Sequence, residues 1–410
     1  MFNLDNWKEI FETIRKNRLR TFLTGFSVLW GIMMLIILLG TGQGLENGVK
    51  NEFRDDAINS IWVYPGRTSM PYKGLKPNRR LRFTNEDFDY VQNRVEGVDE
   101  ITGRFGIWNG LTNRGTKYGT YNIRSVHPGH QLVENTEVTL GRYINKSDIN
   151  ENRKVCVIGK IVRSDLFQND EEVLGQFIKV KGILFKIVGV FDDSGGDGEN
   201  RIIYLPISTA QMVFNAKEQV DQIMFTLTDD DPEYSRTVEA DVLNKFSTKF
   251  RFDPQDQRAI RIRNNVLNFQ QFADLFANVR VFIWFIGIGT LLAGIIGVSN
   301  IMLILVKERT KEIGIRKALG ATPGSIIGLI LMESVFITLV FGYIGLMLGV
   351  LVLDLMASGI EGVEFFQNPG VDIGLAISAT ILLVLSGALA GYIPARQATR
   401  IDPIVALRED

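Results

Sequence analysis

The chain has 410 residues, of which 46% are hydrophobic and 22% are charged, and its mean hydropathy is only +0.09. These values are too polar for a protein that lies entirely within a membrane, so the hydrophobic residues must be concentrated in particular segments. The formal net charge of −1 gives no support for a polyanionic partner such as a nucleic acid.

The first predicted elements approach a membrane and then cross it. Residues 1–20 have the pattern of an amphipathic cytoplasmic helix at the membrane surface, with an apolar side formed by Leu4, Trp7, Phe11 and Ile14. Residues 21–45 carry no charge and are expected to form the first transmembrane helix. The basic residues before this run should keep its start in the cytoplasm. The run is longer than the apolar region of a typical signal peptide, and no small-residue cleavage site closes it.

Residues 46–278 contain no second apolar run of that length, and they are expected to form a large extracytoplasmic domain. The segments of about 46–110 and 215–278 each carry strand and helix patterns, and the two can pair into one α+β subdomain. The segment of about 111–214 is richer in strand patterns and is interpreted as an inserted second subdomain.

Two stretches of the first segment have distinct local patterns. Thr84 and Asp87 have the spacing of a capping box, which predicts a helix that begins there and is closed by Gly97. Just before it, the stretch from Arg67 to Arg82 contains SMPYKGLKPNRRLR, which is rich in proline and arginine and indicates a loop.

Several possible chemical sites in this domain are better explained structurally. His127 and His130 flank a Pro-Gly turn in HPGH, and no third metal ligand is indicated. The acidic loop FDDSGGDGEN lacks the spacing of a calcium-binding loop. Cys156, the only cysteine, is expected to be a buried strand residue and can form no intrachain disulfide. The sequence has no G-x-x-x-x-G-K-[ST] pattern, so the phosphate-binding loop of an ATPase is missing and the chain is not expected to be an enzyme.

A second membrane span leads directly into a short basic segment. Residues 279–306 contain an uncharged run of 26 residues, which as a helix is about 39 Å long against the roughly 30 Å of a bilayer core. In residues 307–324 lysine and arginine outnumber glutamate, so this end should face the cytoplasm. Ile313, Ile315 and Leu319 alternate there with charged residues, in a segment whose shape suits contact with a partner protein.

Two further spans complete the predicted topology. They cover residues 325–353 and 373–395, and an acidic outer loop over residues 354–372 separates them. Residues 396–410 form a tail that carries Arg396, Arg400 and Arg408, so both termini are expected in the cytoplasm.

The span over residues 325–353 carries two unusual features. Glu333 lies about 12 Å along the helix, where a position near the cytoplasmic headgroups is the favoured interpretation and a helix partner or a proton-carrying role is the alternative. Gly345 and Gly349 form a small-xxx-small pair, which favours close packing against another helix.

Three groups of motifs resemble one family. The string VKERTKEIGIRKALGA resembles the signature of the permease superfamily that includes MacB-type and FtsX-like ABC transporter permeases. AGYIPARQATRIDPIVALRED resembles the C-terminal signature of the same permeases. VTLGRYINKSD, VIGKIVRSDLF, LGQFIKVKGILFKIVGV and YLPISTAQMVF resemble blocks of the MacB-type periplasmic core domain, in which a strand-rich subdomain is inserted into a porter subdomain. A basic cluster after any transmembrane helix explains the lysines and arginines of the first string, but not its embedded EIGIRKALGA.

The resemblance implies an α-helical membrane protein with four transmembrane helices and an α+β extracytoplasmic domain of two subdomains. Such a chain is the permease subunit of an ABC transporter in the bacterial plasma (inner) membrane, works as a dimer with a second copy or a paralogue, and supports export or efflux by mechanotransmission. A separate cytosolic ATPase binds ATP and magnesium, so no cofactor is expected on this chain. A periplasmic adaptor and an outer-membrane channel are left open as further partners. The residues expected to contact the ATPase, none of them catalytic, are Glu308, Arg309, Glu312, Ile313, Gly314, Arg316, Lys317, Leu319 and Gly320.

Three other functions are alternatives. Lipoprotein release and control of cell-wall hydrolases occur within the same superfamily. A membrane-anchored sensor or scaffold, whose outer domain binds a ligand, belongs to a different class. A neighbouring gene for an ATPase that has a phosphate-binding loop and no membrane helix would favour the ABC interpretation.

Overall fold

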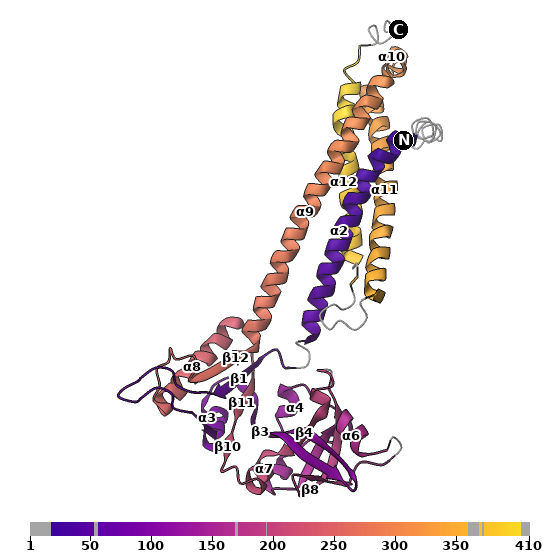
Figure 1. The fold of residues 1–410 in the computed structure, drawn as a ribbon. Helices are drawn as coiled ribbons and strands as arrows, with labels where there is room; N and C mark the ends of the chain where they lie inside the picture. Colours follow the sequence, from indigo (N-terminus) through magenta and orange to yellow (C-terminus); the bar gives the residue numbers. More distant parts are fainter. Residues whose placement is uncertain are drawn as a thin grey trace. The chain divides into compact units, whose positions relative to one another are not determined.

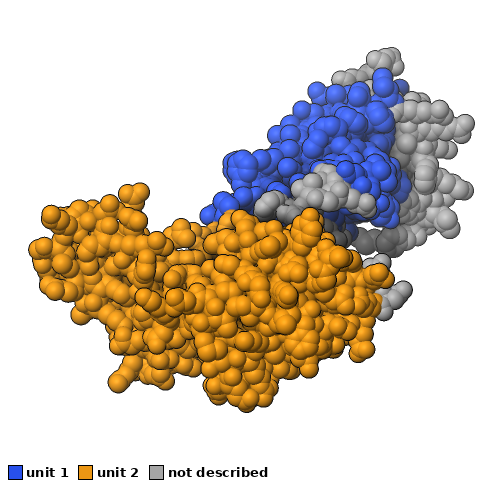
Figure 2. Space-filling model, turned by 60° about the horizontal axis from the view of Figure 1, so that its bottom comes forward, with its two compact units in different colours: residues 1–49, 275–410 blue, residues 50–274 orange. Residues whose placement is uncertain are grey.

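The structure is a computed structural model that describes residues 18–52, 56–168, 171–193, 195–359, 369–370 and 373–402. It divides into two compact units (Figure 2). Unit 1 comprises residues 1–49 and 275–410, and unit 2 comprises residues 50–274.

Four long helices and one short helix build unit 1. The long helices are α2 (Arg18–Glu52), α9 (Asn265–Glu308), α11 (Pro323–Gly359) and α12 (Ile373–Ala398), and the short helix is α10 (Thr310–Ala318) (Figure 1). Each of the four long helices is long and apolar enough to cross a membrane. The expected four transmembrane helices are therefore confirmed.

Three predicted segments lie largely outside the described residues. They are the amphipathic helix over residues 1–20, the outer loop over residues 354–372 and the tail over residues 396–410. Where the loop and the tail are described, they are partly helical, because α11 continues to Gly359 and α12 continues to Ala398.

Two helices extend well beyond the predicted spans. α9 begins at Asn265 and not near residue 279, because its N-terminal sequence contains no helix breaker and Asn264 Oδ1 accepts the N–H of Leu267 at 3.3 Å. α2 continues to Glu52, and past residue 45 its polar turns still form side-chain hydrogen bonds, such as Gln43 Nε2 to Asn47 Oδ1 at 3.1 Å. Charge-free runs thus locate the membrane-compatible part of a helix but not its ends.

Glycines allow the helices of unit 1 to approach closely. A Cβ on Gly345 of α11 would lie 2.5 Å from the carbonyl oxygen of Leu29, and one on Gly349 would lie 2.9 Å from Ile36, both in α2. On its other side α11 meets α12, where Ser334 Oγ donates to the carbonyl oxygen of Gly387 at 2.8 Å. The small-xxx-small pair therefore packs against another helix of the same chain, as its spacing predicts.

Unit 2 contains a ten-stranded mixed sheet with short helices around it. Its strands are β1 (Ser60–Pro65), β3 (Val98–Arg114), β4 (Lys117–Val126), β5 (Glu137–Gly141), β6 (Val155–Gly159), β7 (Phe177–Val180), β8 (Ile183–Asp192), β9 (Ile202–Pro206), β11 (Gln222–Leu227) and β12 (Ile260–Asn264). A separate pair is β2 (Phe83–Thr84) with β10 (Gln219–Val220). The helices are α3 (Asn85–Arg94), α4 (His130–Val133), α5 (Lys146–Asn150), α6 (Lys160–Leu166), α7 (Ile207–Val213), α8 (Pro232–Phe250) and the 3₁₀ helix η1 (Glu199–Arg201).

The strand order brings together segments that are distant in the sequence. The main path is β12-β1-β11-β3-β4-β9-β6-β8-β5, and β7 pairs with β3 and β8. The two strand-and-helix segments meet here, because β1 pairs antiparallel with both β11 and β12. The capping box of α3 is also present, with the N–H of Thr84 donating to Asp87 Oδ2 at 2.9 Å.

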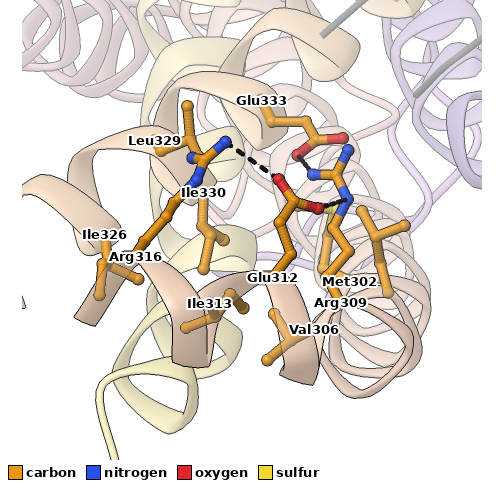
Figure 3. A pocket seen from close by; sticks show the side chains of 11 residues that line it. Met302, Val306, Arg309, Glu312, Ile313, Arg316, Ile326, Leu329, Ile330 and Glu333 are labelled. Carbon is orange, nitrogen blue, oxygen red and sulfur yellow. Dashed lines mark hydrogen bonds and ion pairs between the residues drawn. The ribbon is translucent and has the colours of Figure 1, made fainter. Parts of the chain in front are cut away.

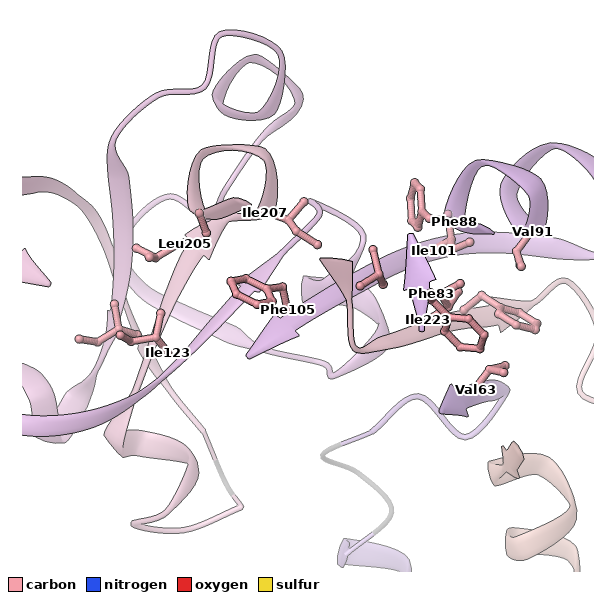
Figure 4. Packing of buried hydrophobic residues seen from close by; sticks show 14 of the residues in the cluster. Val63, Phe83, Phe88, Val91, Ile101, Phe105, Ile123, Leu205, Ile207 and Ile223 are labelled. Atoms are coloured by element: carbon pink, nitrogen blue, oxygen red, sulfur yellow. The ribbon is translucent and has the colours of Figure 1, made fainter. Parts of the chain in front are cut away.

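The two predicted parts of the outer domain share one strand and one core. β3 pairs first with β11 and then with β4, so it runs across the expected limit between residues 110 and 111. A register shift between Ile107 and Gly110 lets this long strand adapt to both neighbours. Figure 4 shows buried side chains spread along β3, from Phe83 near α3 to Leu205 on β9. The two parts are continuous because one sheet and one hydrophobic cluster bind them together.

Candidate functional site

The predicted coupling segment forms α10, a short helix between α9 and α11. It is separated from α9 at Arg309, whose backbone leaves the helical conformation, and it ends at Leu319 and Gly320. Gly320 has φ +95°, which an L-residue adopts only at a cost, so glycine at this position sets the sharp end of the helix. Pro323 then begins α11 at a position that needs no N–H donor.

One face of α10 is packed into the helices of its own chain. The side chain of Ile313 is 8% exposed, and Gly314 is buried beside it. Ile313 lies in the same hydrophobic cluster as Val306, Ile326 and Ile330. A cavity of about 30 Å³ lies at this contact (Figure 3). Ile313 and Gly314 are therefore buried against the chain's own helices, and direct contact of either with a partner protein stays a prediction.

A line of alternating charges borders this cavity. Arg316 Nη2 lies 2.9 Å from Glu312 Oε1, Glu312 Oε2 lies 3.9 Å from Arg309 Nε, and Arg309 Nη1 lies 3.2 Å from Glu333 Oε2 (Figure 3). Glu333 is only 2% exposed. The carboxylate of Glu333 therefore faces a helix partner, as one of the two placements inferred from the sequence has it, and its position near the cytoplasmic headgroups stays a prediction. The pair with Arg309 joins the start of α10 to α11.

A second connection joins the end of α10 to α12. Lys317 Nζ donates to the carbonyl oxygens of Thr399 and Ile401 at 2.9 and 2.7 Å. These carbonyls follow the last turn of α12, where backbone acceptors have no partner within the helix and a lysine side chain satisfies them well. Lys317 therefore holds the segment against the chain that follows α12.

The opposite face of α10 is apolar and exposed. Leu319 is 84% exposed and Ile315 is 44% exposed, and the two lie four residues apart on one helical face. Glu308, Glu312 and Gly320 are also exposed, and Arg316 is partly exposed. Ile315 was absent from the predicted contact set, although its spacing from Leu319 could have identified it.

Unit 2 contains a buried group of charged residues that the sequence analysis missed. Glu134, directly after α4, lies 2.8 Å from Arg104 of β3 and 3.1 Å from Arg124 of β4. Tyr204 of β9 donates to the same carboxylate at 3.2 Å, and His130 Nε2 lies 3.1 Å from it. Four elements therefore meet at one carboxylate. No local pattern reveals this group, because its members are spread widely along the chain.

The environment of this group shifts the pKa values of Glu134 and His130 from their ordinary values. Burial opposes the charge on Glu134, but His130 and the two arginines outweigh it and hold the pKa of this carboxyl well below its usual range. Burial lowers the pKa of His130, although Glu134 acts in the opposite direction. Burial also lowers the pKa of His127 to about 4.

The histidines of HPGH serve the packing of unit 2. His127 Nδ1 accepts the N–H of Gly103 at 3.0 Å, and its ring stacks on Phe88 with ring centres 3.9 Å apart. Within the described ranges, no three residues of the types His, Cys, Asp and Glu are grouped as metal ligands would be. Cys156 is fully buried in β6, and burial raises the pKa of its thiol.

Two family descriptions match most of the sequence. Residues 21–240, more than half of the chain, match the MacB-like periplasmic core domain. Residues 284–403 match the FtsX-like permease C-terminal description.

Individual relatives match over almost the whole chain. The macrolide export ATP-binding/permease protein MacB of Chlorobaculum tepidum is 29% identical over 98% of this chain and 60% of its own length. An uncharacterized ABC transporter permease of Methanocaldococcus jannaschii is 27% identical over 97% of this chain and 96% of its own length. The chain thus spans about 60% of the MacB relative and nearly all of the archaeal permease.

Solved structures of isolated outer domains show a weaker likeness. The periplasmic region of MacB from Actinobacillus actinomycetemcomitans is 17% identical and covers 55% of this chain and 98% of that structure, with a TM-score of 0.45. The extracellular domain of the noncanonic ABC-type transporter YknZ from Gram-positive bacteria is 15% identical and covers 50% of this chain and 100% of that structure, with a TM-score of 0.43.

Proposed function

The chain belongs to the MacB/FtsX-like family of ABC transporter permeases, and on that premise we propose that a cytosolic ATPase on a separate chain drives it through α10. ATP binding closes two ATPase subunits, each subunit displaces the α10 that it contacts, and the extracytoplasmic domain moves in response.

The observation that carries this proposal is the division of α10 into two faces. Ile315 and Leu319 offer an apolar surface to a partner, while Ile313 is anchored in the chain's own helices. The opposite face is tied to α11 through Arg309 and to the end of α12 through Lys317. A force on the exposed face of α10 is therefore transmitted to α11 and to the end of α12, so α10 does not move independently of them.

The nature of the load is part of the same proposal. Export or efflux by mechanotransmission, from a dimer in the plasma membrane, fits a family in which several relatives are named for macrolide export. In lipoprotein release and in control of cell-wall hydrolases, the same movement of the extracytoplasmic domain would act on a lipoprotein or on a hydrolase. A sensor or scaffold would use α10 to bind an adaptor that does not hydrolyse ATP.

An ATPase assay tests the proposal. The purified chain alone should show no ATP hydrolysis, because the sequence lacks a phosphate-binding loop. An ATPase encoded by a neighbouring gene should co-purify with the chain. It should hydrolyse ATP faster when the chain is present. Hydrolysis of ATP by the chain after removal of every co-purifying ATPase would contradict the expectation that the chain alone is inactive. A neighbouring ATPase that neither binds nor responds would favour the sensor or scaffold.

Thiol labelling tests the proposed orientation. Lys311→Cys lies on exposed α10 and Asp197→Cys in an exposed loop of unit 2, whereas Asn200 in that loop is buried and unsuitable. An impermeant maleimide should label Asp197→Cys in intact cells and Lys311→Cys only after permeabilisation. The parent chain is the matched control, because Cys156 is fully buried. Labelling of Lys311→Cys in intact cells would overturn the orientation.

A further inference from the structure

Unit 2 contains a cavity of about 470 Å³ that the proposed coupling mechanism does not use. It lies where β1, β3 and β11 meet the loop before β2, and Tyr64, Arg82, Arg104 and Trp108 are among its lining residues. A volume of this size is in the usual range for small-molecule sites. The cavity also combines aromatic and charged side chains, a composition that fixes a ligand in one orientation.

The lining of the cavity has an excess of positive charge. It contains Arg80, Arg82 and Arg104 but only one carboxylate, that of Asp221. Asp221 accepts the N–H of Gly106 at 3.0 Å and the amide of Gln219 at 2.5 Å. Arg104 Nη1 forms an ion pair with Glu134 Oε1 at 2.8 Å. In the part of the chain that the structure describes, neither the Arg80 nor the Arg82 guanidinium forms an ion pair or a hydrogen bond.

The loop that supplies two of the arginines is held firmly in place. Asp256 accepts hydrogen bonds from the N–H and the hydroxyl of Ser69, both at 2.6 Å, and from the N–H of Met70 at 3.0 Å. At the other end of the loop, the Arg79 guanidinium donates to the carbonyl oxygens of Phe250 and Arg251 at 3.1 and 2.6 Å. Arg80 and Arg82 are therefore presented by a preorganised segment. This is the proline- and arginine-rich stretch that the sequence predicted as a loop.

We infer that this cavity binds a small organic anion. A carboxylate or phosphate group is held by Arg80, Arg82 and Arg104. An attached ring or apolar group lies against Tyr64 and Trp108, of which Trp108 is 75% exposed. The site is independent of α10 and of the proposed ATPase.

Calorimetric titration of the full chain in zwitterionic phosphatidylcholine nanodiscs tests this inference. Phenyl phosphate and benzoate supply the two anionic groups on the same ring, and benzamide is the uncharged control. We expect saturable binding of at least one anion and none of benzamide. The stronger of the two anions identifies the group that the cavity prefers. Absence of saturable binding for both anions, or equal binding of benzamide, would overturn the inference.

Variants locate the binding in the cavity. Arg80→Gln and Arg82→Gln should each weaken binding of the preferred anion about tenfold, because each removes a charge-assisted hydrogen bond. Arg67→Gln is the matched control, since Arg67 lies in the same loop and does not line the cavity. Equal effects of Arg67→Gln and Arg82→Gln would show diffuse attraction and contradict a defined site.

Discussion

Replacing Leu319 and Ile315 together by alanine should abolish most of the stimulation of the partner ATPase while leaving the permease folded and at normal abundance. Truncating a central apolar anchor of an interface costs about 2 kcal/mol or more, which corresponds to roughly thirty-fold weaker binding for each residue. Both side chains project from the unpacked face of α10, so their removal leaves no cavity within the chain. The measurements are ATPase affinity and permease-stimulated turnover in nanodiscs.

Two controls make this result specific to the exposed face. Lys311→Ala changes an exposed charge on the same helix and should alter ATPase binding little. Ile313→Ala should instead lower thermal stability and membrane abundance, because truncating a buried isoleucine costs about 2–5 kcal/mol. If the folded Ile315→Ala/Leu319→Ala variant kept full ATPase binding and turnover, α10 would not be the coupling element.

Replacing Glu134 by glutamine should lower the free energy of unfolding of unit 2 far more than replacing an exposed carboxylate does. Removing one partner of a buried charged group costs about 3–5 kcal/mol. Arg104, Arg124 and Tyr204 all contact this carboxylate, although Arg124 also pairs with Glu199. For a unit of this size the change corresponds to a fall of about 10 °C in the unfolding midpoint. Thermal unfolding of the full chain, followed by hydrogen exchange in unit 2, measures it.

The loss should depend on pH in one direction. The pKa of Glu134 is lowered by folding, chiefly because His130 and two arginines favour its charged form over the opposing effect of burial. Its contribution to stability is therefore fully present above the ordinary glutamate pKa of 4.5 and is lost as the pH falls below that value. The difference between Glu134→Gln and the parent should be constant near neutral pH and should shrink in acid.

An exposed carboxylate provides the comparison for this effect. Glu151→Gln removes a surface partner of Arg153 at 2.9 Å, and it should change the midpoint little at any pH. If Glu134→Gln had no larger effect than Glu151→Gln, the buried group would not contribute to the stability of unit 2.

Local patterns in the sequence determined the elements that depend on neighbouring residues. Long apolar runs identify four transmembrane helices, since the cost of burying charge in lipid acts on each segment separately. The capping box at Thr84 is likewise a contact between residues three positions apart. The shared helical face of Ile315 and Leu319 could also be predicted, because their spacing of four residues is visible in the sequence.

Only the tertiary structure decided which side of each element is buried and which distant residues meet. Ile313 and Leu319 are both apolar residues between charges, and the packing of α10 against α9 and α11 alone makes one a core residue and leaves the other exposed. Glu134 pairs with arginines of β3 and β4, and Lys317 donates to carbonyl oxygens that follow α12. Such contacts join residues far apart in the chain, and their energies depend on burial and distance, which a linear pattern of residues does not contain.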